Sequence, residues 1–302
     1  MSAQADSLKS VLFALGANLG IAISKAVAAF ITGSGAMLAE AIHSFADSAN
    51  QGLLLWGMKS AKKPADDDHP LGYGKVIYFW SFIVALLLFS VGGLFSINEG
   101  WHKLHSTAPV VSPWIAIGVL GFSIVLEWFS LMGCVAEVNK IRAGRSWWRW
   151  FRESRQSELV VVFGEDIAAL FGLAFALVAV GLTILTGNPV FDALGSIAIG
   201  VLLIVVAVLL SNQIKSMLVG QSAEAPLRAA LASQLRSEAQ IVELLQVLTL
   251  HFGDDLMVAV KARMRDAQSS HVLAENINAI EDRLKAAFPE VRWIFFEPDV
   301  RA

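Results

Sequence analysis

The stretch Ala39-Glu-Ala-Ile-His-Ser-Phe-Ala-Asp-Ser-Ala-Asn50 places three ionisable side chains inside a long apolar run. His43 and Asp47 are four residues apart, so on a helix they lie on one face, one turn from each other. An imidazole nitrogen and a carboxylate oxygen at that spacing can bind one divalent cation. Glu40 lies three residues before His43, near the same face. Ionisable groups are costly in hydrocarbon, so the stretch predicts a metal site within a membrane rather than the polar face of a soluble helix.

The composition indicates a protein with several membrane-spanning helices. Hydrophobic residues make up 56% of the 302 residues and charged residues only 16%, whereas a soluble domain has about 25% charged residues. The single cysteine, Cys134, excludes an intrachain disulfide and a cysteine-based zinc site. No cleaved signal peptide is expected before the first apolar segment. The formal net charge of −3 comes from the residues after position 220, which argues against a nucleic-acid partner.

Six apolar segments reach the length of about 20 residues that a helix needs to cross a bilayer. They are predicted at residues 11–31, 37–60, 76–97, 113–138, 159–185 and 189–211. The links after the second and fourth segments, counted with Lys59 at the end of the second segment, hold ten Lys and Arg residues, whereas the other links hold only Lys103. Positive residues stay on the cytoplasmic side, so both termini are expected in the cytoplasm, with the protein in an inner or plasma membrane. Trp147, Trp148 and Trp150 stand among these arginines and are typical of an interfacial belt or an amphipathic surface helix.

Residues 221–302 have a different composition and are predicted to form a small cytoplasmic domain. Helices are expected at 226–239 and 270–288, and strands at 241–252, 256–264 and 291–296. Gly253-Asp254-Asp255 predicts a hairpin turn between the first two strands. The order α-β-β-α-β suggests a ferredoxin-like α+β fold. The chain is therefore expected to comprise a six-helix transmembrane domain, residues 1–220, and a ferredoxin-like domain, residues 221–302.

The fifth apolar segment supplies the second part of the candidate site. Asp166 follows Glu165 near the start of this segment, and with His43 and Asp47 it gives three ligands. Glu165 or water could complete the four N and O ligands that zinc favours. Such a set also admits Fe²⁺, Co²⁺ or Mn²⁺, because the affinity order alone does not decide the metal. The alternative for Glu165 and Asp166 is a helix start at the membrane surface, where acids favour the helix dipole.

Several other polar groups are weaker candidates. Residues 66–69, Asp-Asp-Asp-His, could collect cations near a cytoplasmic entrance or form an ordinary solvated loop. Glu127 could relay protons or only pack, and Lys25 could pair with a carboxylate or reach the membrane surface. A regulatory metal site in the tail could draw on His251, Asp254, Asp255, His271 and Glu297, although each alone is more often a surface or turn residue.

Taken together, these features resemble the cation diffusion facilitator family. Residues 66–75, Asp-Asp-Asp-His-Pro-Leu-Gly-Tyr-Gly-Lys, are similar to the family pattern D-x-x-H-x-x-G-H/Y-G-K between spans two and three. Residues 192–196, Asp-Ala-Leu-Gly-Ser, resemble the opening of its sixth span. The stretch from Glu40 to Asn50-Gln51 looks like the zinc transporter nine-like branch. The resemblance covers nearly the whole chain.

The resemblance implies a dimeric antiporter with a transport site built from spans two and five. The family uses a four-spaced pair of ligands from each of these spans, which implies ligands at His43, Asp47 and Asp166. The fourth position falls on Val162, which cannot ligate a metal, so Glu165, Glu40 or water would replace it.

The resemblance also implies two further metal sites outside the spans. One would use Asp66 and His69, with Tyr73 at a position where a histidine often stands. The other would lie in the tail near His271 and Glu297, with Lys261 where a histidine is common. The departure at Lys261 predicts a weak tail site or none.

The sequence therefore predicts a homodimeric membrane protein, not an enzyme, that exports divalent cations in exchange for protons. Zn²⁺ is the expected substrate, with Fe²⁺, Co²⁺, Cd²⁺ or Mn²⁺ as alternatives. Ligands must lose their protons to bind metal, and His43 is the natural proton carrier near pH 7. Two other classes remain: a metal-binding membrane sensor or scaffold without transport, which Val162 favours, and an intramembrane hydrolase. The hydrolase is disfavoured because the chain has no H-E-x-x-H motif and no nucleophile elbow.

Overall fold

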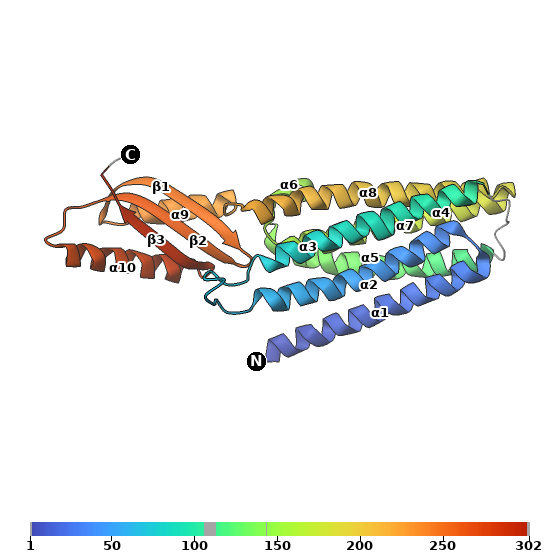
Figure 1. Ribbon diagram of the computed structural model, residues 1–302, viewed down its shortest axis with the longest axis horizontal. Coiled ribbons are helices and arrows are strands. Elements are labelled where there is room, and N and C mark those ends of the chain that lie inside the picture. The colour runs from blue at the N-terminus through green and yellow to red at the C-terminus, as the bar shows by residue number, and fades with distance from the viewer. Residues whose placement is uncertain (1, 106–112, 143, 301–302) are drawn as a thin grey trace.

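The computed structural model describes residues 2–105, 113–142 and 144–300. Long helices form an elongated bundle, and a small unit of helices and strands lies beyond one end of it (Figure 1). The described residues contain two separate clusters of buried hydrophobic side chains, one within the bundle and one within the C-terminal unit. The bundle and the C-terminal unit therefore each have a core of their own.

Every apolar segment predicted from the sequence is helical. The helices of the bundle are α1 (Ser2–Thr32), α2 (Gly35–Ala61), α3 (Val76–Leu87), α4 (Phe95–Leu104), α5 (Pro113–Ile141), α7 (Ser157–Thr186) and α8 (Val190–Val219). A π-helical segment, η1 (Leu88–Leu94), joins α3 to α4, so the third predicted segment is one rod that continues to Leu104. His102 consequently lies in the last turn of α4.

The hydropathy of these helices identifies a helical membrane protein. Among the described residues, four segments are long and apolar enough to cross a membrane: Val76–Leu104, Trp114–Ile141, Ser157–Thr186 and Val190–Val219. Within the part of the chain that the structure describes, α1 contributes a shorter apolar stretch, Asn18–Thr32. The α2 helix is long enough, but Glu40, His43 and Asp47 interrupt its apolar character.

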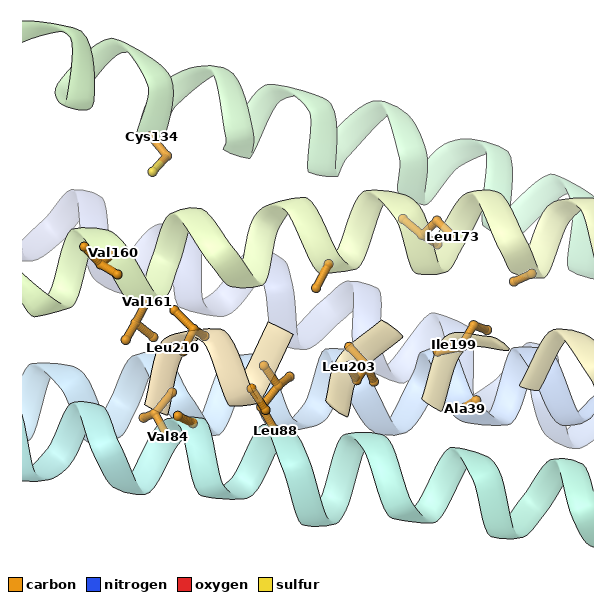
Figure 2. Close-up of a cluster of buried hydrophobic side chains, with 14 of the residues drawn as sticks. Ala39, Val84, Leu88, Cys134, Val160, Val161, Leu173, Ile199, Leu203 and Leu210 are labelled. Carbon is orange, nitrogen blue, oxygen red and sulfur yellow. The ribbon is translucent and has the colours of Figure 1, made fainter. Parts of the chain in front are cut away.

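Small residues allow the third rod to pack closely on α8. A Cβ atom on Gly200 would lie 2.6 Å from the carbonyl oxygen of Gly93, and one on Gly100 would lie 2.6 Å from the carbonyl oxygen of Ala193. Farther along the contact, Val84 and Leu88 face Leu203 and Leu210 of α8 (Figure 2). Such small-residue contacts are typical of helix pairs in membranes.

Asp192 caps the N-terminus of α2 from the start of α8. Its carboxylate accepts hydrogen bonds from the backbone N–H of Gly35 at 2.6 Å and from the hydroxyl of Ser34 at 2.5 Å. Ser34 in turn accepts from the N–H of Met37. A carboxylate is favourable at a helix N-terminus because unpaired N–H groups and the helix dipole converge there. The Asp-Ala-Leu-Gly-Ser motif therefore has a structural role in holding α2 against α8.

The C-terminal unit confirms the predicted order of helices and strands. It comprises α9 (Ala225–Ser237), β1 (Ile241–Phe252), β2 (Asp255–Met264), α10 (Ser270–Ala287) and β3 (Val291–Pro298). The sheet order is β1-β2-β3, with an antiparallel β1–β2 pair and a parallel β2–β3 pair. Alternate β2 residues, Leu256, Val258, Val260 and Ala262, are buried in the core of this unit.

The loop between α2 and α3 contacts the β1–β2 turn of the C-terminal unit. A Cβ atom on Gly74 would lie 2.1 Å from the carbonyl oxygen of Phe252, so only glycine allows this approach. The hydroxyl of Tyr78 also donates to the carbonyl of Gly253 at 3.3 Å. Gly74, the second glycine of the Gly-Tyr-Gly-Lys motif, thus allows the C-terminal unit to pack against the end of the bundle.

Candidate metal transport site

The site begins with a His–Asp pair on α2. His43 Nδ1 and Asp47 Oδ1 are 3.4 Å apart, as expected for residues one helical turn from each other. The His43 side chain is 0% exposed, and neither ring nitrogen has a hydrogen-bond partner among the described residues. A buried polar atom without a hydrogen-bond partner is unfavourable, so the two ring nitrogens indicate a ligand that binds here and supplies the missing contact.

Acidic residues from three helices line one narrow cavity beside this pair. Asp47 of α2, Glu127 of α5, and Glu165 and Asp166 of α7 all border it, as does Val162. The remaining lining residues are Asn18, Ser44 and Gln51. The structure therefore brings three of the four predicted ligands to one cavity, and it places Val162 there as well. His43 lies next to Asp47 but is not part of the lining.

The two acids of α7 differ in their hydrogen bonds. Glu165 Oε1 accepts from the side-chain amide of Asn50 on α2 at 2.6 Å. Asp166 Oδ1 accepts only a long hydrogen bond, 3.5 Å, from the hydroxyl of Ser130 on α5, and its Oδ2 is buried without a partner in the described chain. Asp166 is thus the freer of the two for a cation, while Glu165 already ties α7 to α2.

A fully buried ion pair lies one turn before His43. Lys25 Nζ is 3.3 Å from Glu40 Oε2 and donates to the Ser44 hydroxyl at 2.7 Å. Both charged side chains are 0% exposed, so Lys25 pairs with a carboxylate and does not reach the membrane surface. Glu40 fits only because α7 has a glycine there, since a Cβ on Gly172 would lie 2.4 Å from Glu40 Oε1.

The four predicted ligands do not form a closed metal site in this conformation. Among residues 2–105, 113–142 and 144–300, no three His, Cys, Asp or Glu side chains are close enough together to hold a metal ion. Candidate ligands stand on both helices: Asp47 of α2, with His43 beside it, and Asp166 of α7. The arrangement offers half of a site on each helix.

The loop candidates, Asp66 and His69, are occupied by each other and by a tyrosine. Asp66 Oδ1 accepts from the backbone N–H of His69 at 2.7 Å, and Asp66 Oδ2 accepts from the Tyr73 hydroxyl at 2.6 Å. The hydrogen bond from Tyr73 holds the pKa of Asp66 below its ordinary value. The same bond raises the pKa of Tyr73. Tyr73 therefore takes the place that a metal ligand would need.

Some tail candidates have partners, whereas His251 Nδ1 is buried without a hydrogen-bond partner in the described chain. Lys261 Nζ is 2.6 Å from Asp299 and 3.8 Å from Glu297, and the hydrogen bond to Asp299 raises the pKa of the lysine. His271 lies 3.3 Å from Glu275 on the exposed face of α10. His251 is largely buried, which lowers its pKa. The described tail residues do not gather three ligands at one point.

Sequence reasoning missed two polar contacts that position the site. Asn50 holds Glu165, and Ser130 contacts Asp166. Neither residue type is unusual in a membrane helix, so the sequence carries no signal for Ser130. Asn50 could have been found, because it lies one turn past Asp47 toward the same face as His43.

Comparison with known proteins gives the family. Residues 11–219 match the model of the cation efflux transmembrane domain. The human protein "Proton-coupled zinc antiporter SLC30A9, mitochondrial" is 36% identical over 200 residues, which cover 66% of this chain and 35% of that protein. "Metal tolerance protein C4" from Arabidopsis thaliana is 34% identical over 218 residues, or 72% of this chain and 48% of that protein.

A bacterial relative is more distant. "Magnetosome protein MamB" from Magnetospira sp. (strain QH-2) is 29% identical over 191 residues, which cover 61% of this chain and 58% of that protein. This chain spans between a third and a half of the length of the antiporter and the plant protein. The match to the transmembrane domain agrees with a transporter and confirms the prediction that the chain is not an enzyme. The chain belongs to the cation efflux family.

Proposed function

We propose that this chain is a homodimeric, proton-coupled antiporter that exports Zn²⁺ from the cytoplasm by alternating access. The observation that carries the proposal is the narrow cavity between α2, α5 and α7, which is lined by four carboxylic acids deep in an apolar bundle. Unpaired ionisable groups in such a place mark ion pathways. The names of the human and plant relatives point to the same substrate class.

The proposed topology has six spans, with α1 and α2 crossing the membrane beside the four apolar helical segments. Their polar groups, such as Lys25 and Glu40, are buried inside the bundle and do not face lipid. The α2–α3 loop, which holds Lys62, Lys63 and Lys75, and the arginine-rich region around α6 (Trp147–Glu153) lie at the bundle end that faces the tail (Figure 1). That distribution supports a cytoplasmic tail and cytoplasmic termini.

The domain division follows the same boundary. Residues 1–220 are the proposed transport domain, and residues 221–302 the proposed ferredoxin-like domain. The α8 helix ends at Val219, and the family match ends at the same residue. The α-β-β-α-β order of the tail supports the ferredoxin-like assignment.

The proposed ligands are His43, Asp47 and Asp166, with Glu165 as the fourth. Because α2 and α7 each hold only part of the set, metal binding requires these two helices to approach each other. Movement of Glu165 toward the metal would break its hydrogen bond to Asn50, so that bond separates an open arrangement from a closed one. Ligand sets that assemble only in one conformation are what alternating access needs.

Proton coupling follows from the ligand chemistry. Carboxylates and imidazole bind a cation only after they release their protons, so metal and protons compete for the same atoms. A high proton concentration on the outer face favours metal release there. His43 is the ligand type that exchanges a proton most readily near neutral pH.

One observation favours a second function, that of a metal-binding sensor or scaffold without transport. Val162 borders the cavity at the position where the family implies a fourth ligand, and it offers no atom to a metal. A site with a poor fourth ligand could bind without turning over. The missing ligand at Val162 also weakens the preference for Zn²⁺, so Fe²⁺, Co²⁺ or Mn²⁺ could be the substrate in its place.

The test is metal-dependent proton flux in sealed vesicles that contain the purified chain. Zn²⁺, Fe²⁺, Co²⁺, Cd²⁺ and Mn²⁺ are compared for the wild type, His43→Ala and the control Glu137→Gln. Glu137 is an exposed acid on α5 that pairs with Lys140. We expect Zn²⁺-driven flux that His43→Ala abolishes and Glu137→Gln retains. Tight Zn²⁺ binding without flux for any metal would favour the sensor.

A further inference from the structure

A large apolar groove lies on the side of the bundle, away from the candidate metal site. Its floor is α7 with Phe163 and Ile167, and its walls include Val135 of α5 and Val206 of α8. Trp148 of the short helix α6 borders the same groove. The groove has a volume of about 670 Å³ and an almost wholly apolar lining. This is within the range of roughly 300–1,000 Å³ for sites that hold small molecules.

The α6 helix is held firmly at one end of this groove. Trp150 is 0% exposed and anchors the helix in the bundle core. The side-chain amide of Gln213 on α8 donates to the carbonyls of Arg152 at 2.9 Å and Ser154 at 3.2 Å. Trp147 stacks on Phe163 with ring centroids 5.4 Å apart. These contacts fix α6 against the bundle, so the end of the groove that α6 forms is an ordered part of the structure.

The groove end is also strongly basic. Residues 140–155 contain six Lys and Arg residues and one acid, Glu153. Most of these cations have partners: Arg145 pairs with Glu224, and Arg149 pairs with Glu153. Within the described part of the chain, the exposed Arg152 guanidinium has no hydrogen bond or ion pair.

Helical spacing places this unpaired guanidinium at the rim of the groove. Arg152 follows Phe151, which lines the groove, and lies one turn after Trp148, which also lines it. Arg149 lies on the other side of α6 from Phe151, toward Glu153. One basic group thus remains free at the point where the apolar groove meets the tryptophan-rich end of the bundle.

We propose that this groove binds a phospholipid with an anionic headgroup. An acyl chain of the lipid occupies the apolar groove between α5 and α8, and the lipid phosphate contacts Arg152 of α6. Tryptophans are favoured at the headgroup level of a membrane, and basic pockets between membrane helices recognise anionic lipids. Phosphatidylcholine would also fill the groove, but its choline cation offsets the charge of its phosphate, so its attraction to the guanidinium is weaker. The site does not depend on the transport proposal, because it shares no residue with the cavity of Asp47 and Asp166.

The test is native mass spectrometry of the full chain in detergent, with phosphatidylglycerol or phosphatidylcholine of identical acyl chains added. We expect the wild type to retain phosphatidylglycerol about fivefold better than phosphatidylcholine, the effect of roughly one positive charge at a membrane surface. Arg152→Gln removes this preference and retains phosphatidylcholine. Arg149→Gln removes the same charge from a neighbouring position of α6 that points away from Phe151 and pairs with Glu153, and it changes the ratio less than twofold. Val206→Trp fills the groove and reduces the retention of both lipids.

Three results would overturn the proposal. One is equal retention of the two lipids by the wild type. Another is the same loss of preference in Arg149→Gln as in Arg152→Gln, which would mean diffuse attraction to the basic region without a site. The third is a change in the mass of the assembly in Val206→Trp with lipid retention unchanged, which would assign the groove to a second copy of the chain. Arg152→Gln keeps the test valid if Val206→Trp fails to fold.

Discussion

The buried groups of the bundle and the polar groups of the loop and tail satisfy their hydrogen bonds very differently. In the bundle, His43, Asp47 and Asp166 have buried polar atoms without a hydrogen-bond partner among the described residues. The 3.4 Å contact between His43 and Asp47 is longer than an ordinary hydrogen bond. In the loop, both carboxylate oxygens of Asp66 accept hydrogen bonds. In the tail, Lys261 pairs with two acids. All of these residues stand at positions that the family resemblance connects with metal.

We propose that the difference separates a metal-binding role inside the bundle from a structural role at Asp66 in the loop and Lys261 in the tail. A buried polar atom without a partner costs about 1–3 kcal/mol, so it persists where function requires it. Tyr73 and Lys261, in contrast, supply hydrogen bonds where a histidine would supply a ligand.

The largest difference in Zn²⁺-driven proton flux is expected between the same substitution, Asp to Asn, made in the bundle and in the loop. Asp166→Asn removes a charged ligand from the cavity and should reduce Zn²⁺-driven proton flux at least about 100-fold, as loss of a ligand exceeds the 10–100-fold loss typical of its supporting contacts. Asp66→Asn should leave the flux within about twofold, because Tyr73 and the His69 backbone already occupy its oxygens. Initial rates in sealed vesicles measure both. Equal losses would mean that the loop also carries the metal.

The next effect concerns the buried ion pair beside the site. Lys25→Met leaves Glu40 buried without its partner and should lower the free energy of unfolding by about 3–5 kcal/mol. Adding Glu40→Gln should restore part of this loss, because the uncompensated charge is removed. Thermal unfolding of the purified chain in detergent gives the double-mutant cycle. Additive losses in the double variant would show that the two side chains do not interact.

The contact between the α2–α3 loop and the tail should be nearly as sensitive to substitution as the buried ion pair. Gly74→Ala places a Cβ atom against the backbone of Phe252, and neither backbone can yield without moving the tail away from the bundle. We expect faster hydrogen exchange in the β1–β2 turn. Gly52→Ala is the matched control, since a Cβ there meets no atom within 4 Å. Unchanged exchange in Gly74→Ala would contradict the contact.

A better fourth ligand than Glu165 should strengthen the site in the bundle. Val162→His places an imidazole at the cavity and should raise Zn²⁺ affinity by about 10-fold or more, because the imidazole can replace Glu165, which is held by Asn50, in a tetrahedral set of N and O ligands. Val162→Phe adds a similar volume without a ligand and should not raise affinity. Competition with a zinc chelator measures both variants. Weaker binding in Val162→His would show that this position lies outside the metal's reach.

The smallest effect is a pH dependence in the loop. The hydrogen bond from Tyr73 depresses the pKa of Asp66 below its ordinary value of 3.8. A depressed pKa means that the contact stabilises the loop above this ordinary value and is lost as the pH falls through the depressed pKa. Tyr73→Phe should therefore raise the pKa of Asp66, which NMR of the labelled carboxyl group detects. An unchanged titration would show that Tyr73 does not hold the carboxylate.

Much of this architecture follows from periodicity, because long apolar segments and alternating strands leave few choices. The sequence predicts all the described tail elements, and Asp47, Glu165 and Asp166 do line one cavity. The partners of these residues are less predictable. That Tyr73 would bond to Asp66, or that Gly74 would meet Phe252, depends on how distant segments pack. Local patterns identify ionisable groups in a membrane but do not reveal which of them are already paired.

The most direct test of the central claim is zinc X-ray absorption spectroscopy of the full chain loaded with one equivalent of Zn²⁺. We expect one imidazole nitrogen at about 2.0–2.1 Å together with oxygen ligands and no sulfur. His43→Ala should remove the imidazole signal, and His271→Ala should leave it unchanged. An imidazole signal that survives in His43→Ala and disappears in His271→Ala would place the bound metal in the tail and contradict the account.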